Sequence, residues 1–147
     1  MATSEQFSRL FTVEEANNLL PLLRPLMKQI FDKLDFLRLE TETVIREENL
    51  SPDSPNLMER LHERDTIACL IQEVRELVDE VNAYGCVCKG VEEGLVDFPC
   101  VFSGEIVFLC WRYGEENLTH WHHIEDGFAG RRPLLDLDQG GGNISYH

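Results

Sequence analysis

The sequence is short of positive charge and of long apolar runs. Its 147 residues carry 27 acidic side chains against 13 Lys and Arg, which gives a formal net charge of −14. An acidic surface repels nucleic-acid phosphates and anionic lipid headgroups, so we expect no nucleic-acid partner and no membrane-surface partner. No stretch approaches the roughly 20 apolar residues that cross a bilayer, which excludes a transmembrane helix.

Paired cysteine motifs and a secretory signal are also missing. The five cysteines include no Cys-x-x-Cys pair, so neither a zinc ribbon nor a thioredoxin-like redox motif is indicated. The N-terminal residues lack the basic and apolar regions of a signal peptide, so we expect a cytoplasmic protein with free thiols. A chain of this length is most simply one domain, covering residues 1–147.

Residues 11–84 have the pattern of two long helices. Thr12, followed three residues later by Glu15, forms a capping box that starts the first helix. Apolar positions then alternate in spacings of four and three, as on a helix packed along another helix. Pro21 and Pro25 each remove a backbone donor, so we expect a kink or restart there, with a short first piece and a long second piece. The alternating series comprises Ala16, Leu20, Leu23, Met27, Ile30, Leu34, Leu37, Thr41 and Val44.

The first helix should end near Glu48. After a loop, Ser54 is the expected N-cap and Pro55 the first residue of a second helix, which runs to Tyr84. Two such helices form an antiparallel hairpin, whose legs, at about 1.5 Å per residue, are longer than a small core needs. We therefore expect the helical hairpin to bind a second copy of the chain and to form a homodimer.

Residues 85–134 change to period-two alternation and turn residues, which indicates an antiparallel meander of three or four strands. Its apolar face should lie on the helices, which gives an α+β fold. The glycine-rich segment 135–147 is expected to be a flexible tail. The predicted strands are 86–89, 95–102, 105–113 and 118–124.

The last two predicted strands bring potential metal ligands together. With a loop centred on Glu115 and Glu116, Trp111 faces His120 across the hairpin. His120 and His122 then point to one face and offer two imidazoles to one ion. A carboxylate from Glu115, or from Asp97 on the neighbouring strand, completes a ligand set suited to zinc or iron.

A loop that differs by one residue gives another pairing. Cys110 then faces either His120 or His122. A cysteine and a histidine together favour zinc or a nucleophilic thiol instead. All three pairings remain open at the level of the sequence.

Asp97 is an acidic residue inside an apolar run, where a buried carboxylate needs a partner. The structural interpretation is an ion pair with Arg112 or Arg131, and the functional interpretation makes Asp97 a metal ligand or a base. The segment Gly127-Phe-Ala-Gly-Arg131 lacks the strand and helix start that flank a phosphate loop, so it is predicted to be a packing turn.

Several sequence blocks together resemble a known family of small prokaryotic proteins, catalogued as domain of unknown function 2203, over residues 11 to about 134. The resemblance implies a cytosolic bacterial protein with a helical hairpin and a small sheet, and it implies no reaction. The pattern shared with the family includes His122 but does not require a histidine at position 120. It therefore favours a site of Asp97, Glu115 and His122, with Cys110 and Arg112 nearby. The matching blocks are Phe11-Thr12-x-Glu14-Glu15-Ala16-Asn17, Gly94-Leu95-Val96-Asp97-Phe98-Pro99, Leu109-Cys110-Trp111-Arg112-x-Gly114-Glu115, Trp121-His122 and Gly127-Phe128-Ala129-Gly130-Arg131.

Three hypotheses for function follow. The first is a homo-oligomeric interaction or structural module without chemistry. The second is a divalent-metal-binding protein or metal-dependent enzyme with His122, Glu115 and Asp97 as ligands, His120 and Cys110 in reserve, and zinc or iron as the metal. The third is a thiol redox or thiol-nucleophile protein that uses Cys110.

Overall fold

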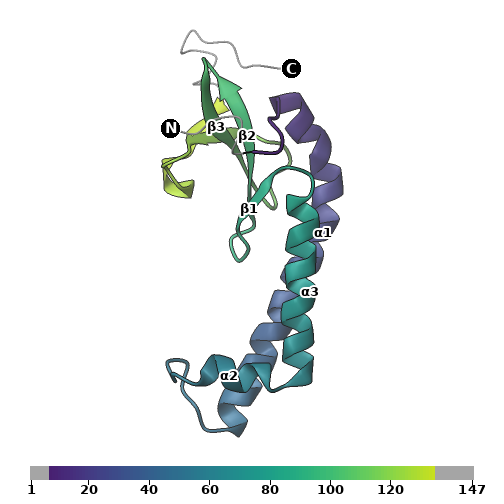
Figure 1. Cartoon of the computed structure of the whole chain (residues 1–147), viewed down its shortest axis with the longest axis vertical. Coiled ribbons are helices and arrows are strands. Elements are labelled where there is room, and N and C mark those ends of the chain that lie inside the picture. Colours follow the sequence, from purple (N-terminus) through teal and green to yellow (C-terminus); the bar gives the residue numbers. More distant parts are fainter. Residues whose placement is uncertain (1–6, 135–147) are drawn as a thin grey trace.

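The computed structural model describes residues 7–134 and has an α+β fold (Figure 1). The predicted tail, 135–147, lies outside the described residues. Within the described part, no helix is long and apolar enough to cross a membrane. The elements in chain order are α1 (Val13–Glu47), α2 (Leu57–His62), α3 (Asp65–Asn82), β1 (Val87–Gly90), β2 (Leu95–Phe102), β3 (Glu105–Arg112), β4 (His120–His123), the short 3-10 helix η2 (Phe128–Gly130) and β5 (Arg132–Pro133).

Helix α1 starts with the predicted capping box. Thr12 Oγ1 accepts a hydrogen bond from the Glu15 backbone N–H at 3.0 Å, and Glu15 Oε1 accepts one from the Thr12 N–H at 2.9 Å. The helix then continues through both prolines to Glu47, so the expected division into two pieces is not found. The apolar positions around the prolines, such as Leu20 and Leu23, are fully buried, and their packing offsets the backbone donors that proline removes.

The second helical segment differs from the prediction of one long helix from Pro55 to Tyr84. It is broken between α2 and α3, and the Ser54 side chain accepts a hydrogen bond from Ser51 inside the loop rather than capping a helix. Arg64 lies at the break with an extended backbone, and its guanidinium donates to Glu47 and Glu48 at the end of α1, both at 3.2 Å. The expected hairpin of two equal legs is therefore one long helix packed against two shorter ones. Figure 1 shows α1 and α3 side by side as an arm that extends beyond the sheet, with α2 at its far end.

The five strands form one antiparallel sheet in the order β1-β2-β3-β4-β5. All four predicted strands are present, although the last one is shorter than the predicted 118–124. The sequence missed β5, where Arg132 pairs with Trp121 and Pro133 with His120, because two residues that include a proline carry no alternating pattern.

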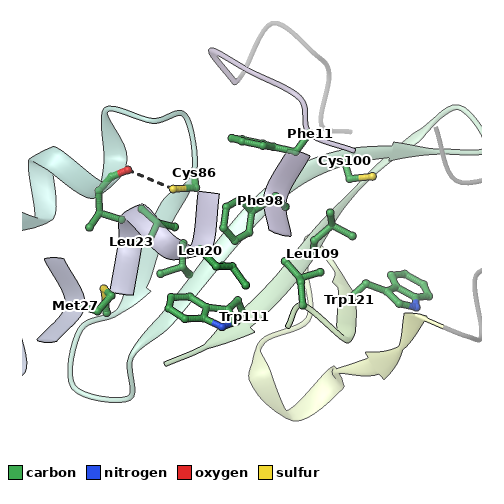
Figure 2. Close-up of a cluster of buried hydrophobic side chains, with 14 of the residues drawn as sticks. Phe11, Leu20, Leu23, Met27, Cys86, Phe98, Cys100, Leu109, Trp111 and Trp121 are labelled. Atoms are coloured by element: carbon green, nitrogen blue, oxygen red, sulfur yellow. Dashed lines mark hydrogen bonds between the residues drawn. The ribbon is translucent and has the colours of Figure 1, made fainter. Parts of the chain in front are cut away.

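The apolar face of the sheet lies on the helices, as predicted. Figure 2 shows Phe98, Leu109 and Trp111 packed against side chains of α1 such as Leu20 and Met27. Because side chains alternate along a strand, the residues between these point to the opposite face. That second face carries the candidate site.

Candidate metal centre

The pairing of β3 with β4 decides which ligands meet. Cys110 faces His120, and Phe108 faces His122. The predicted pairing centred on both Glu115 and Glu116, which placed Trp111 opposite His120, is therefore wrong. The alternative register in which Cys110 faces His120 is correct. The loop is centred on Glu115 alone because this residue closes it. The Glu115 N–H donates to the Arg112 carbonyl at 2.9 Å, and its side chain accepts from the Arg112 N–H at 2.7 Å.

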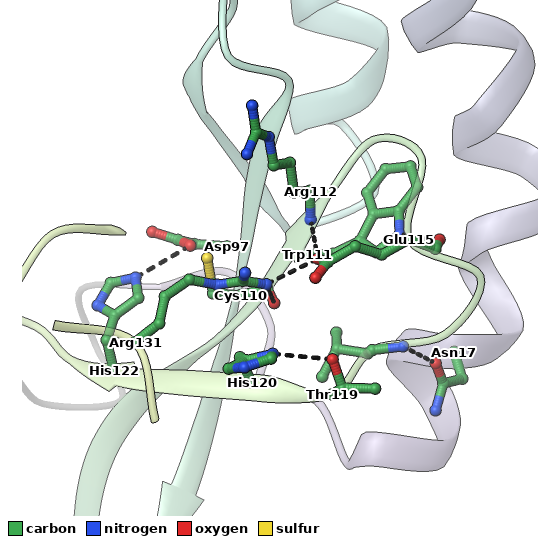
Figure 3. Close-up of polar contacts among 11 residues, drawn as sticks. Asn17, Asp97, Cys110, Trp111, Arg112, Glu115, Thr119, His120, His122 and Arg131 are labelled. Atoms are coloured by element: carbon green, nitrogen blue, oxygen red, sulfur yellow. Dashed lines mark hydrogen bonds and ion pairs between the residues drawn. The ribbon is translucent and has the colours of Figure 1, made fainter. Parts of the chain in front are cut away.

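Three buried side chains from three neighbouring strands converge on this face: Asp97 of β2, Cys110 of β3 and His122 of β4 (Figure 3). Their exposed fractions are 2%, 1% and 3%. Asp97 and Cys110 are direct cross-strand partners, and His122 is diagonal to Cys110. One carboxylate oxygen, the thiol sulfur and one ring nitrogen lie within 4.8 Å of one another, and His122 Nε2 is 3.1 Å from Asp97 Oδ1.

The His122 ring is held in one orientation. Its Nδ1 lies 2.7 Å from the backbone oxygen of His123, and because a carbonyl only accepts, Nδ1 carries the hydrogen. Nε2 then points toward Asp97 and Cys110. A backbone carbonyl that fixes one ring nitrogen and leaves the other free is the common arrangement behind a metal-binding histidine.

The surroundings of His122 favour its protonated form. Burial lowers the pKa of His122, but hydrogen bonds with Asp97 and Cys110, together with the negative charge of Asp97, outweigh burial and raise this pKa to about 10. An imidazolium therefore lies between a carboxylate and a thiol at neutral pH. A positive charge is already favoured at the position where a metal ion would bind.

Two of the sequence-predicted ligands lie outside this cluster. Glu115 Oε1 accepts from Arg131 Nη2 at 2.7 Å, so Glu115 anchors the loop rather than facing Asp97. His120 faces Cys110 in the register, but its Nδ1 lies 2.8 Å from Thr119 Oγ1. The structure thus brings together Asp97, His122 and the reserve residue Cys110.

The partner of Asp97 also differs from the structural interpretation. Neither Arg112 nor Arg131 pairs with it, and its ion pair is with His122. Arg131 instead donates to Glu115 and, at 3.1 Å, to the backbone oxygen of Cys110. Sequence reasoning gave Arg131 no such role, and the signal that it could have used is the second carboxylate, Glu115, on the adjacent loop.

A cavity of about 120 Å³ adjoins the three side chains. Segment 124–128, part of which was predicted to be a packing turn, forms one of its walls. A second hollow, of about 400 Å³, shares three lining residues with the first: Lys89, Leu95 and Phe128. These hollows were not predicted, because the residues that line them come from strands and loops far apart in the sequence.

The fold and the site define a small α+β protein whose sheet carries a buried group of mixed oxygen, sulfur and nitrogen donors. The model of a family described as "Uncharacterized conserved protein (DUF2203)" matches residues 9–134, and the chain belongs to this family. The match confirms the resemblance found in the sequence and adds no reaction. No curated protein and no solved structure matches the chain.

Proposed function

We propose that the protein binds a divalent metal ion, zinc above all, through Asp97, Cys110 and His122. The proposal rests on the convergence of three buried donor atoms within 4.8 Å. Bond lengths of about 2.0–2.3 Å place neighbouring ligands of tetrahedral zinc about 3.3–3.8 Å apart. Small side-chain rotations therefore suffice to bring the three donor atoms into coordination.

The donor types favour zinc over the other metals considered. A thiolate is a poor ligand for magnesium, calcium or manganese, which prefer oxygen. Non-haem iron sites of the facial type use two histidines and a carboxylate, whereas only His122 of the two neighbouring histidines joins this cluster. One sulfur, one nitrogen and one oxygen suit zinc.

Three protein ligands leave one coordination position open. Structural zinc sites are usually closed by four side chains, while catalytic sites keep a position for water or substrate. Asp97, Cys110 and His122 all line the cavity of about 120 Å³, so a metal ion held by them would have space beside it for water or substrate. We infer a metal-dependent enzyme whose bound metal activates a water molecule or polarises an oxygen of a substrate.

The same geometry argues against a nucleophilic thiol. An activated cysteine needs a histidine with one ring nitrogen on the thiol and the other on an orienting group. The orienting Asp97 and the thiol of Cys110 instead face the same nitrogen of His122, and the other nitrogen binds a carbonyl. This arrangement suits coordination of an ion at Nε2 better than proton transfer through the ring.

Metal analysis tests the proposal. Purified protein is equilibrated with zinc, dialysed and analysed by elemental mass spectrometry, alongside Cys110→Ala and the matched control Cys100→Ala, a buried cysteine of β2 in the helix-facing core. We expect about one zinc ion per chain in wild type and control, and none in Cys110→Ala. Absence of stoichiometric metal from wild type after supplementation with zinc, iron and manganese would overturn the proposal.

A second, compatible function is supported by exposed apolar side chains on α1. Leu22, Phe36 and Leu39 are each about half exposed, at 52%, 50% and 54%. We propose that Phe36 and Leu39, which lie three residues apart on one face of α1, join two copies of the chain into a homodimer. Light scattering coupled to size exclusion tests it: a mass of twice 17.0 kDa that returns to 17.0 kDa in Phe36→Glu/Leu39→Glu supports the dimer, and a monomeric wild type contradicts it.

A further inference from the structure

Two cationic side chains flank the candidate metal centre. Lys89 lines both the small cavity and the larger hollow, and Arg112 lines the larger one. Arg112 faces Leu95 across the sheet, one same-face step beyond the cross-strand pair of Asp97 and Cys110. Such a step is about 7 Å along a strand, so Arg112 lies next to the proposed metal ligands on the same face of the sheet.

Both cationic side chains lie close to aromatic rings beside the site. The Lys89 ammonium lies 5.1 Å from the ring centre of Phe108, and Phe108 contacts His122 with ring centres 5.6 Å apart. The Arg112 guanidinium lies 5.5 Å from the ring centre of Phe128, which lines both hollows. Cation–π contacts of this kind favour positions near the hollows over extended positions in solvent.

Both charges lack a carboxylate partner within the described residues. Among residues 7–134, neither Lys89 nor Arg112 forms an ion pair within 4.0 Å, in a chain where acidic residues outnumber Lys and Arg by 27 to 13. The larger hollow has one carboxylate of its own, Glu93, which lies against Gly90. Asp126 lines only the smaller cavity. Two cations thus face one carboxylate in the larger hollow.

We propose that the larger hollow binds a small organic anion, a carboxylate or a phosphate monoester, as the substrate of the metal centre. Its charged group lies between Lys89 and Arg112, and its apolar part rests on Leu95 and Phe128. Its reacting group lies at the side of the hollow formed by Lys89, Leu95 and Phe128, which also line the smaller cavity. This inference rests on the proposed metal-dependent function, and it adds the chemical class of the substrate.

The experiment uses the intact chain loaded with cobalt(II), whose visible spectrum reports on ligands at the metal. Benzoate and phenyl phosphate are the anionic probes, and benzamide is a neutral probe of similar size. Arg112→Gln and Lys89→Gln are compared with Arg132→Gln, in which the altered residue lies over Trp121 and lines neither hollow. We expect at least one anionic probe to bind and to perturb the cobalt spectrum, with affinity reduced about tenfold or more in the first two variants and unchanged in the third.

The choice of probes distinguishes a carboxylate substrate from a phosphate ester. The comparison of cobalt binding with anion binding tests the metal site and the anion site separately. Preference for benzoate identifies a carboxylate substrate, and preference for phenyl phosphate identifies a phosphate ester. If cobalt binds but neither anion binds at millimolar concentration, or if benzamide binds equally well, the inference is overturned while the metal site stands. If cobalt does not bind, the metal proposal fails, and calorimetry on the metal-free chain then tests the anion site alone. Anion binding that Arg112→Gln abolishes supports the anion site. Absence of anion binding overturns it.

Discussion

Asp97 Oδ1 and His122 Nε2 lie 3.1 Å apart in a part of the sheet where both side chains are less than 5% exposed. Removing one member of a buried charge pair leaves the other without compensation. We therefore expect Asp97→Asn to lower the free energy of unfolding of the metal-free protein by about 3–5 kcal/mol, measured by urea denaturation.

A surface pair provides the control for that prediction. His123 Nδ1 and Glu105 Oε1 are 3.8 Å apart and both partly exposed. Solvent screens such a pair, so Glu105→Gln should cost less than about 1 kcal/mol. Equal effects of the two substitutions would show that Asp97 and His122 are not coupled in the folded protein.

The stability of the metal-free protein should fall as the pH rises. The folded-state pKa of His122 is raised from 6.5 to about 10, so the contribution of this pair is fully present below about pH 6.5 and is lost as the pH rises toward 10. We expect this loss to be of order 5 kcal/mol, seen as a difference between wild type and His122→Gln in urea denaturation across this range. A constant difference between the two proteins would contradict the assignment.

The fold was predictable where local chemistry decides it. Thr12 and Glu15 marked the start of α1, and the alternation along β2 and β3 marked both strands and their core face. The break before α3 was not predicted, because no proline or glycine marks it and the contacts of Arg64 at this point are with Glu47 and Glu48, which are not its neighbours in the sequence.

The site was only partly predictable for a similar reason. Asp97 stood out because of the apolar run around it, and His122 stood out because of its pairing with His120 and the family resemblance. The choice between Cys110 and Glu115 depended on a register difference of one residue. That register is fixed by the side chain of Glu115, which binds Arg112 and Arg131. The carboxylate that was expected to bind metal is the group that positions the hairpin.

Glu115→Gln should therefore distinguish a structural role of Glu115 from a role as a metal ligand. The substitution removes the charge that faces Arg131 but leaves all three proposed ligands in place, so zinc content should stay at about one ion per chain. Loss of the charged hydrogen bond should lower the free energy of unfolding by about 1–2 kcal/mol. Elemental analysis and urea denaturation of the same preparation measure the two effects, and loss of zinc without loss of stability would return Glu115 to the ligand set.

Thiol labelling should distinguish the cysteines by burial. Burial raises the pKa of Cys86 to about 12 and that of Cys100 to about 11, and Cys69 is exposed. Because the thiolate is the reactive form, iodoacetamide near pH 7.5 should modify Cys69 first and leave Cys86, Cys100 and the buried Cys110 unmodified until the chain unfolds. Peptide mass spectrometry gives the order, and rapid labelling of Cys110 in the folded protein would favour the thiol hypothesis instead.

The central claim is that one zinc ion is held by Cys110, His122 and Asp97. X-ray absorption spectroscopy of the zinc-loaded protein tests it most directly, because sulfur and lighter donors differ in distance and scattering. We expect one sulfur at about 2.3 Å with nitrogen and oxygen donors at about 2.0–2.2 Å, and loss of the sulfur signal in Cys110→Ser. A zinc environment without sulfur in the wild-type protein would contradict it.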